Sequence, residues 1–568
     1  MKVSDYIVDY LIQKGITDVF GYPGGMVTHL MDSFQKRQGE ISAHVTYHEQ
    51  GAAFAACGYA QANETVGVAY ATSGPGATNL ITGICNAYFD STPTLFLTGQ
   101  VNTFERRGQL GVRQRGFQET DIVSMVSGVT KYAACVESPQ DIRRQLDCAF
   151  HAATSGRKGP ALLDIPMNVF RGEIDPETLS GFQPEPSASS LSPEQVQLLA
   201  RHLSEARRPV LLLGSGIKSA GAVRQAQALA AQLGIPTVST MPAVDILNAS
   251  DLNYGFIGAY GSRTANFVVA KCDLLITLGA RLDVRQVGAK RENFAPNAAI
   301  IRVDIDPGEL EYRVREDEIQ IQAGVVEVMD AIAAMIQRNP VSCPQWIQVC
   351  DTIRDALMDM DQMLPNRLMA KLSECIPENA VITTDVGQNQ VWAAQSFRTK
   401  PGQRIFFSGG HGAMGYSLPA AIGCCLPHKN PVFSLNGDGG IQMNLQELQT
   451  IAREQLPVKI IVFNNSALGM IRHFQEMYFG GSYCQTVPQG GYTVPEFGKV
   501  AGAYGLNYHL VESEADIRKE LFSGSGPCLI EVAIHEDTYV FPKLEFGKPN
   551  QDQEPRMDRA LFDRLMAL

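Results

Sequence analysis

Residues 431–470 read PVFSLNGDGGIQMNLQELQTIAREQLPVKIIVFNNSALGM, and this stretch decides the fold class. It opens with an apolar run that ends in GDG at 437–439, and a second apolar run, 458–463, ends in NN at 464–465. The segment between the two runs has a helical pattern. Short apolar runs separated by a helix predict strand, helix, strand in a parallel sheet, and hence an α/β fold.

The polar residues that follow the two runs form a candidate metal site. Because the carboxyl ends of neighbouring parallel strands open onto a shared crevice, we expect Asp438 and Asn465 to emerge side by side. Their oxygens suit Mg²⁺, which takes one or two protein carboxylates and completes its shell with phosphate oxygens and water. The glycines Gly437, Gly439 and Gly440 would let the backbone approach a phosphate closely. A tight turn followed by a capping Asn pair is the purely structural alternative.

The complete pattern, GDG followed after a spacer by NN, resembles the signature of thiamine diphosphate enzymes. The resemblance implies thiamine diphosphate and Mg²⁺ as cofactors, with Asp438, Asn465 and the carbonyl of Ala467 as metal ligands. The cofactor-binding positions that it implies in this part of the chain are Gly387, Gln388, Gly412, Met414, Gly437, Gly439, Gly440, Ala467, Leu468, Gly469 and Met470.

The composition narrows the class of protein. At 568 residues the chain is too long for one core and predicts three or four domains. Its net charge of −12 argues against nucleic acid or an anionic membrane as the main partner. The N-terminus carries Asp5 and Asp9 in an amphipathic pattern rather than a secretory signal, and the sequence has no apolar run long enough to span a membrane. Scattered cysteines without a CxxC pair are typical of a reducing compartment, so we expect a cytoplasmic protein.

Residues 1–170 alternate helical and apolar patterns and carry two motifs. YPGG at 22–25 is a sharp turn, and YHEQGA at 47–52 overlaps a strand predicted at 44–47 and opens a helix. Taken alone, Glu49 is an acidic residue in the first turn of a helix, where the helix dipole favours a carboxylate. Together the motifs resemble the pyrimidine domain of the acetolactate synthase family. That resemblance implies that Glu49 activates the cofactor by general acid–base action.

Further site residues in this domain are implied by the same resemblance. FQET at 117–120 matches a family motif in which Phe117 and Gln118 face the reaction space. Gln118 and Gly25 would help to polarise substrate oxygens. The cofactor contacts implied by the YPGG turn are Tyr22, Pro23 and Gly24.

An arginine-bearing insertion, residues 101–116, precedes FQET and is longer than the family pattern. It contains Arg106, Arg107, Arg113 and Arg115. Such a run of charge usually faces water. Alternatively it forms an anion clamp at the mouth of the active site, because Arg binds phosphate through two parallel hydrogen bonds. The sequence leaves both interpretations open.

A second α/β unit is predicted for residues 193–337 and resembles the flavin-binding central domain of the family. Two positions depart from the family pattern, because Val284 and Gly324 stand where it has aspartate. Arg285 is also implied to face the carboxylate of a second keto acid. The positions that match FAD contacts, which imply FAD as a further cofactor, are Gly214, Gly216, Arg281, Arg285 and Asp304.

The third unit, predicted for residues 355–545, contains two positions that bear on the reaction. Met414 could be an ordinary core residue, whereas the resemblance makes it the apolar wedge that holds the cofactor bent. Phe474 stands where biosynthetic acetolactate synthases have tryptophan, and the smaller ring implies a wider acceptor site.

The sequence thus predicts an α/β protein with three doubly wound parallel-sheet domains: pyrimidine-binding, central flavin-type and diphosphate-binding. Irregular segments rich in proline and serine predict linkers at 171–192 and 338–354, and residues 546–568 form a tail that ends in an amphipathic helix.

The implied reaction is decarboxylation of a 2-keto acid, with pyruvate as the expected donor, and transfer of the two-carbon unit to a second carbonyl. Arg285 favours another 2-keto acid as acceptor, which gives 2-acetolactate. The arginine-bearing insertion, Phe474 and the tail favour a nucleotide-linked keto sugar instead. Two functions of different kinds also fit the motifs, namely a flavin-dependent pyruvate oxidase and a non-catalytic cofactor-binding regulator. The family resemblance implies a homodimer or homotetramer with its active site at the subunit interface.

Overall fold

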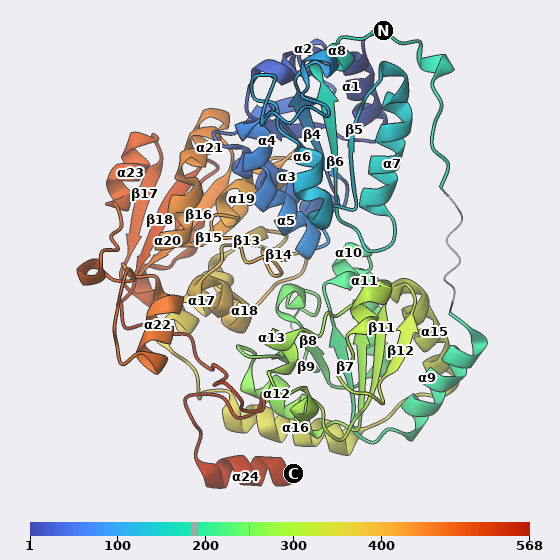
Figure 1. Cartoon of the computed structure of the whole chain (residues 1–568). Helices are drawn as coiled ribbons and strands as arrows, with labels where there is room; N and C mark the ends of the chain where they lie inside the picture. Colours follow the sequence, from blue (N-terminus) through green and yellow to red (C-terminus); the bar gives the residue numbers. More distant parts are fainter. Residues whose placement is uncertain (185–190, 249) are drawn as a thin grey trace.

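The computed structural model of the protein describes residues 1–184, 191–248 and 250–568, so part of the predicted linker, residues 185–190, lies outside the described residues. The described strands form three six-stranded sheets flanked by helices, and neighbouring strands within each of these sheets run parallel (Figure 1). This arrangement confirms the predicted α/β class with three doubly wound domains. The domain boundaries themselves stay predictions.

The first sheet has the strand order β2-β1-β3-β4-β6-β5. Its inner strands β3 and β4 are buried along their whole length, as expected where helices cover both faces of a parallel sheet. The strands are β1 (Asp18–Gly21), β2 (Ser42–Val45), β3 (Gly67–Ala71), β4 (Thr94–Gln100), β5 (Tyr132–Cys135) and β6 (Pro160–Pro166). The helices are α1 (Val3–Gln13), α2 (Thr28–Lys36), α3 (Glu49–Asn63), α4 (Pro75–Asn79), α5 (Ile81–Phe89), α6 (Ile122–Val126), α7 (Ile142–Thr154) and α8 (Met167–Phe170).

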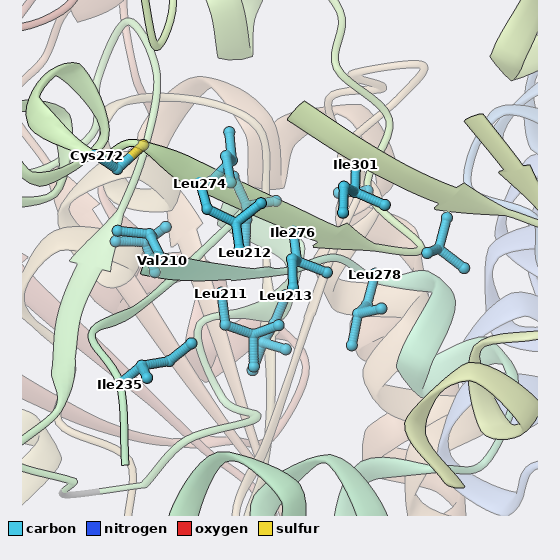
Figure 2. Close-up of a cluster of buried hydrophobic side chains, with 14 of the residues drawn as sticks. Val210, Leu211, Leu212, Leu213, Ile235, Cys272, Leu274, Ile276, Leu278 and Ile301 are labelled. Carbon is cyan, nitrogen blue, oxygen red and sulfur yellow. The ribbon is translucent and has the colours of Figure 1, made fainter. Parts of the chain in front are cut away.

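The second sheet has the order β12-β11-β10-β7-β8-β9. Figure 2 shows its core, where leucine and isoleucine side chains of β7, β10 and β11 pack against one another. The strands are β7 (Pro209–Leu213), β8 (Thr237–Ser239), β9 (Asn253–Phe256), β10 (Leu274–Leu278), β11 (Ala299–Asp304) and β12 (Ile319–Gln322). The helices are α9 (Pro193–Glu205), α10 (Gly216–Ser219), α11 (Val223–Leu233), α12 (Arg263–Lys271), α13 (Val284–Val287), α14 (Pro307–Glu311), α15 (Val325–Arg338) and α16 (Pro344–Leu357).

The third sheet has the order β14-β13-β15-β16-β18-β17, which repeats the topology of the first sheet. The strands are β13 (Val381–Thr384), β14 (Arg404–Phe407), β15 (Val432–Gly437), β16 (Val458–Asn464), β17 (Asn507–Val511) and β18 (Cys528–Ala533). The helices are α17 (Leu364–Cys375), α18 (Gln388–Ser396), α19 (Ser417–Cys425), α20 (Asp438–Ile441), α21 (Leu448–Glu454), α22 (Gly469–Tyr478) and α23 (Phe497–Ala503), with the 3₁₀ segment η8 (Gln442–Glu447) between α20 and α21.

Helices α3 and α19 join the first and third domains. Each follows the second strand of its sheet, and the two helices cross in close contact. A Cβ built on Gly58 would lie 2.1 Å from the Ala420 carbonyl oxygen, and one on Gly423 would lie 1.9 Å from the Ala55 carbonyl oxygen. Glycine at both positions therefore allows the two backbones to approach without side chains between them.

The chain beyond β18 returns to the second domain. The Leu544 N–H donates to the Ala259 carbonyl over 2.7 Å, and Lys271 Nζ donates to the Met566 carbonyl over 2.7 Å. The last helix, α24 (Arg559–Ala567), buries Leu565 in a small cluster with Phe267 of α12. The tail thus docks on the second domain, whereas the sequence left its place open. Across the described residues, helices that could cross a bilayer are absent.

Candidate active site

Two neighbouring strands of the third sheet bring the predicted metal ligands together. β15 and β16 pair in parallel, with Gly437 opposite Phe463, so Asp438 and Asn465 follow adjacent strand ends. The Ala467 N–H donates to Asp438 Oδ2 over 3.2 Å and to Asn465 Oδ1 over 3.3 Å. The structure therefore places the three predicted ligand residues in one cluster.

The orientation of Asn465 is fixed by its neighbours. Ser466 has a φ of 52°, and this left-handed conformation turns the chain back after β16. Asn465 Nδ2 donates to Gln388 Oε1 over 3.0 Å, and Gln388 Nε2 donates to the Thr538 carbonyl over 2.8 Å. Because the amino group of Asn465 is engaged in this way, its Oδ1 is the atom left on the Asp438 side.

Asp438 lies in surroundings that suit a bound cation. The residue is 3% exposed, and burial raises the pKa of its carboxyl to about 7 although N–H groups and the Tyr492 hydroxyl hydrogen-bond to it. In the described part of the chain no cationic side chain is paired with it. A divalent ion would favour the ionised form. A carboxylate, an amide oxygen and a carbonyl are the donors that Mg²⁺ prefers.

The same residues line a cavity of about 390 Å³. A Cβ built on Gly439 would lie 2.6 Å from Leu468 Cδ2 and 3.4 Å from Met414 Cε. Glycine at this position therefore leaves room for the Leu468 and Met414 side chains that line the cavity. The cavity therefore has room for a diphosphate beside Asp438 and Asn465. The other predicted cofactor-binding residues that line it are Gly387, Gln388, Met414, Gly437, Gly439, Gly440, Ala467, Leu468, Gly469 and Met470.

A turn before α19 carries Met414 into the cavity. Gly412, with a φ of 70°, lies in the exposed part of this turn and is not among the lining residues. The Gly415 N–H donates to the Asp385 carboxylate over 2.9 Å, and burial raises the pKa of that carboxyl to about 7. Asp385, which the sequence motifs did not single out, therefore fixes the backbone next to Met414.

Glu49 is the first residue of α3 in the first domain. His48 caps the helix, because its Nδ1 accepts from the Gln50 N–H over 3.0 Å. Glu49 is 8% exposed, and Asn79 Nδ2 donates to its Oε2 over 2.9 Å. In the described chain Glu49 is paired with no cation. Its carboxyl group is therefore available to a ligand as a general acid or base.

The other predicted residues of the first domain lie on its surface or in turns. Gly25, the last residue of the YPGG motif, opens a 3₁₀ turn, Tyr22 is 41% exposed and Phe117 is 80% exposed. Gln118 has a φ of 64° and lies against Gly74, which has no Cβ to interfere. The lining residues of the Asp438 cavity all come from the second and third domains. One chain therefore does not bring Glu49 and its neighbours to that cavity.

A second cavity, of about 350 Å³, lies where all three domains meet, and some of the residues predicted for the flavin site line it. Arg281 and Arg285 line it, but Gly214, Gly216 and Asp304 do not. Gly214 and Gly216 pack against Gly279, where a Cβ on Gly214 would lie 2.0 Å from the Gly279 carbonyl oxygen. The two glycines thus have a packing role in the turn after β7, while Ser215 between them reaches the cavity.

Three lining residues of this second cavity were missed by reasoning from the sequence. Arg157 pairs with Asp306 over 2.9 Å and stands in the motif GRKGP, whose glycine-flanked basic pair was an available signal. Lys218 binds both oxygens of Asp245. Asp90 accepts the Gly409 and Gly410 N–H groups through Oδ1, whereas its buried Oδ2 has no partner among the described residues. That acceptor fits a ligand with an N–H or O–H donor, such as a flavin or a ribose.

Arg285 lies between the two cavities. Its guanidinium carbon is 5.6 Å from the centre of the Tyr260 ring, and both residues line both cavities. Val284, one of the departures from the family pattern, is 60% exposed, and Asp283 caps α13 and binds Arg281 over 2.7 Å. Arg281 therefore has an acidic partner even though Val284 is apolar.

Phe474 belongs to an exposed aromatic cluster beyond the cavity. Its ring centre lies 4.7 Å from that of Tyr478 and 5.9 Å from that of Phe479, both at the end of α22. Phe546 of the tail lies 6.4 Å away and is 72% exposed. Ile471 of the same helix lines the Asp438 cavity, so α22 carries both a wall of the cavity and part of this aromatic cluster.

The arginine-bearing insertion folds around Glu119. The Glu119 carboxylate accepts the N–H groups of Arg107 over 2.7 Å and Arg115 over 3.0 Å. Arg106 pairs with Glu137 over 2.7 Å, whereas the side chains of Arg107, Arg113 and Arg115 are exposed. The structure therefore leaves both interpretations of this loop open.

Comparison with known proteins agrees with this geometry. Three thiamine pyrophosphate enzyme domains match the chain: the N-terminal TPP binding domain at residues 1–125, the central domain at 196–332 and the C-terminal TPP binding domain at 385–532. The chain is 34% identical over 564 residues to the acetolactate synthase isozyme 2 large subunit of Escherichia coli (strain K12), covering 97% of this chain and 99% of that protein. It is 36% identical over 560 residues to the isozyme 1 large subunit of the same organism, covering 97% of each.

A relative from another organism gives the same result. The chain is 37% identical over 560 residues to the probable acetolactate synthase large subunit of Methanocaldococcus jannaschii, covering 94% of this chain and 92% of that protein. These matches extend over nearly the whole sequence and include all three sheets. The chain therefore belongs to the thiamine pyrophosphate enzymes and, within them, to the acetolactate synthase family.

Proposed function

We propose that this thiamine diphosphate-dependent carboligase decarboxylates pyruvate and transfers the two-carbon unit to a second 2-keto acid to give 2-acetolactate, with Mg²⁺ as a second cofactor. The observation that carries the proposal is the cluster of Asp438, Asn465 and Ala467 on the wall of a cavity that also contains Met414. A diphosphate and its metal would be held there by backbone and oxygen donors.

When bound, thiamine diphosphate supplies a nucleophilic carbon and an electron sink for the decarboxylation. The chain's own residues would hold it and move protons. The carboxyl group of Glu49 would exchange a proton with the pyrimidine ring nitrogen, and Asp438, Asn465 Oδ1 and the Ala467 carbonyl would hold Mg²⁺. Arg285 would bind the carboxylate of the acceptor through paired hydrogen bonds.

We further propose that two copies of the chain complete each site, as a homodimer or a homotetramer. The support is that the Asp438 cavity is lined by residues of the second and third domains only, while Glu49, Gly25, Phe117 and Gln118 lie elsewhere. A Glu49→Gln chain mixed with an Asp438→Asn chain tests this. If the sites are shared, hybrid dimers have one intact site, and activity returns to about a quarter of the wild-type value after subunit exchange. If each site belongs to one chain, no activity returns.

FAD is proposed for the cavity of about 350 Å³ where the three domains meet. Arg281, Arg285 and Asp90 Oδ2, which has no partner in the described part of the chain, support this, because a flavin nucleotide offers phosphates to the arginines and an N–H to the carboxylate. Titration with FAD, followed by flavin fluorescence quenching, measures the binding. Oxygen consumption with pyruvate would instead favour the flavin-dependent oxidase.

The acceptor is tested by supplying pyruvate alone, with thiamine diphosphate and Mg²⁺, and by assaying acetoin after acid treatment. Rapid formation of acetoin supports 2-acetolactate as the product, because pyruvate then serves as both donor and acceptor. A pyruvate turnover that stays slow until a second carbonyl compound is added would count against it.

A nucleotide-linked keto sugar is the second candidate acceptor. The exposed side chains of Arg107, Arg113 and Arg115 would suit phosphates, and the exposed cluster of Phe474, Tyr478, Phe479 and Phe546 would suit stacking with a base. In that case, pyruvate consumption rises on addition of a nucleoside diphosphate keto sugar. Rapid acetolactate formation from pyruvate alone removes this candidate.

A further inference from the structure

The third domain holds the segment between β2 and α3 of the first domain. Thr450 Oγ1 and Arg453 Nη2 both donate to the Val45 carbonyl, over 3.0 Å and 2.9 Å. Glu454 Oε2 lies 2.7 Å from His44 Nδ1. One face of α21 therefore covers the short connection that leads to the proposed catalytic carboxylate.

Glu447 is at the centre of this contact. Its Oε1 accepts the Tyr47 N–H over 2.9 Å and the His48 N–H over 3.1 Å, and its Oε2 accepts the Thr450 hydroxyl over 3.2 Å. The side chain is fully buried, with 0% exposure. Two successive N–H groups that point at one oxygen form a nest, which holds that acceptor oxygen in place.

The first turn of α3 is shaped around the Glu447 carboxylate. A Cβ built on Gly51 would lie only 2.5 Å from Glu447 Oε1. Any larger residue at this position would push the carboxylate away from the two N–H groups. Gly51 and Glu447 thus fit each other, although they come from different domains.

We propose that Glu447 is a positioning residue, through which the third domain sets the backbone from which Glu49 projects. The inference rests on the proposed role of Glu49. The His48 N–H that binds Glu447 belongs to the residue just before Glu49, so loss of the carboxylate frees the start of α3. A displacement of about 1 Å of a catalytic group costs about 10²-fold in rate.

Glu447 lies only a short distance along the chain from the predicted metal ligand Asp438. η8 follows α20, so the segment 438–447 carries the predicted metal ligand Asp438 at one end and Glu447 at the other. The same short piece of backbone therefore supports both halves of the catalytic machinery. If two copies share each site, it links one site's metal ligand to the Glu49 that serves the other site.

The test compares Glu447→Met, which keeps the length of the side chain but offers no oxygen, with Glu447→Gln, which keeps the acceptor oxygen and can donate to Thr450. We expect kcat for pyruvate to fall about 10²-fold in Glu447→Met and to stay within about threefold in Glu447→Gln, with the pyruvate KM little changed in both. Glu454→Gln is the matched control, since it lies in the same contact but binds His44 rather than the 47–48 backbone, and it keeps kcat within about twofold.

A second readout needs neither cofactor nor turnover. Amide hydrogen exchange by mass spectrometry on the cofactor-free protein should show faster exchange at residues 47–48 in Glu447→Met, with wild-type protection in Glu447→Gln and Glu454→Gln. Wild-type exchange at these amides in Glu447→Met, or faster exchange with no loss of kcat, overturns the inference.

A variant that does not fold and a failure of the proposed function can both be told apart from a failure of this inference. If Glu447→Met does not fold, Gly51→Ala replaces it, because the added Cβ displaces the same carboxylate, and the same loss of kcat and amide protection is expected. If the wild-type chain takes up no thiamine diphosphate and turns over no pyruvate, the proposed function fails. In that case the amide exchange experiment still shows whether Glu447 holds the backbone of residues 47–48.

Discussion

The Arg285 guanidinium lies over the Tyr260 ring, 5.6 Å from its centre, and the two residues form a wall between the Asp438 cavity and the cavity proposed for FAD.

We expect Arg285→Gln to raise the KM for the acceptor keto acid about tenfold, because a charge-assisted pair of hydrogen bonds to its carboxylate is lost. Decarboxylation of the donor should change little. Arg291→Gln, an exposed arginine stacked on Tyr312, is the control. An unchanged acceptor KM would show that Arg285 does not bind the carboxylate.

Removal of the metal should abolish cofactor binding. Asp438 is the one carboxylate in the proposed ligand set, so we expect Asp438→Asn to weaken Mg²⁺-dependent uptake of thiamine diphosphate by at least about 100-fold. Titration calorimetry with and without EDTA measures this. Tyr492→Phe, which removes the hydroxyl 3.3 Å from Asp438 Oδ1, should have a smaller effect. Wild-type affinity in the presence of EDTA would exclude this cluster as a metal site.

Glu49→Gln should separate cofactor binding from cofactor activation. The glutamine keeps the size of the side chain and the contact with Asn79, but its amide cannot act as an acid or a base near neutral pH, so we expect kcat to fall by about 10²- to 10⁴-fold. The dissociation constant of thiamine diphosphate should change far less. Glu40→Gln, at an exposed position of the same domain, is the control. Full activity of Glu49→Gln would falsify the proposed mechanism.

The stability of the contact between the first and third domains should depend on pH through His44. Burial disfavours the charged imidazolium, but hydrogen bonds to Asp18 and Glu454 outweigh it and raise the pKa of His44 from 6.5 to about 9. Because the pKa is raised in the folded protein, this stabilisation is complete below pH 6.5 and is lost as the pH rises through about 9. Each such hydrogen bond contributes about 1.5–3 kcal/mol.

Thermal unfolding of the wild type and of His44→Gln from pH 6 to pH 10 checks this expectation. The difference in Tm between the two proteins should be largest at the acid end and should shrink toward pH 10. A difference that grows with pH would mean that the imidazolium is not the stabilising form.

The crossing of α3 and α19 should not tolerate a side chain at its closest point. In Gly423→Ala the new Cβ would meet the Ala55 carbonyl oxygen at 1.9 Å, and backbone cannot move aside as a flexible side chain does. We expect a loss of about 1–3 kcal/mol in the free energy of unfolding, measured by denaturant titration. Gly502→Ala, in α23 with nothing within 4 Å of its Cβ, should instead be neutral or stabilising by about 0.5–1 kcal/mol. Equal effects of the two substitutions would contradict the close crossing.

The sequence predicted local features well where spacing along the chain determines them. The runs at 431–437 and 458–463 became β15 and β16, and their parallel pairing brought Asp438 and Asn465 together. The strand predicted at 44–47 is shifted in the structure, because β2 ends at Val45, where its ladder with β1 stops. The N–H groups of Tyr47 and His48 bind Glu447 of the third domain rather than a neighbouring strand. The local sequence pattern around residues 44–48 gives no sign of this distant partner.

Contacts between domains explain most of what the sequence could not show. Asp90 and Arg157 reach the second cavity because the three domains meet there, and neither Asp90 nor the GRKGP motif around Arg157 reveals from the sequence which distant residues lie beside it. Gly214 and Gly216 form a glycine motif that is typical of nucleotide binding. In the structure the two glycines let the turn after β7 approach the backbone of Gly279 closely. The structure thus gathers the residues of the diphosphate motifs around one cavity, whereas Gly214, Gly216 and Asp304 stay predictions for the flavin site.

The docked tail has a mechanical consequence. The third domain is joined to the second at its beginning, through α16, and at its end, where Leu544 binds Ala259 and α24 rests on α12. Direct contacts also cross this boundary, because Lys218 Nζ donates to the Ile405 carbonyl over 2.7 Å and Gln395 Nε2 donates to the Tyr260 carbonyl over 2.9 Å, so the tail works as a strap over two domains that already touch. A protease cut within the tail would remove this strap and leave the two domains joined by α16 and by their direct contacts, among them the one from Gln395 to Tyr260.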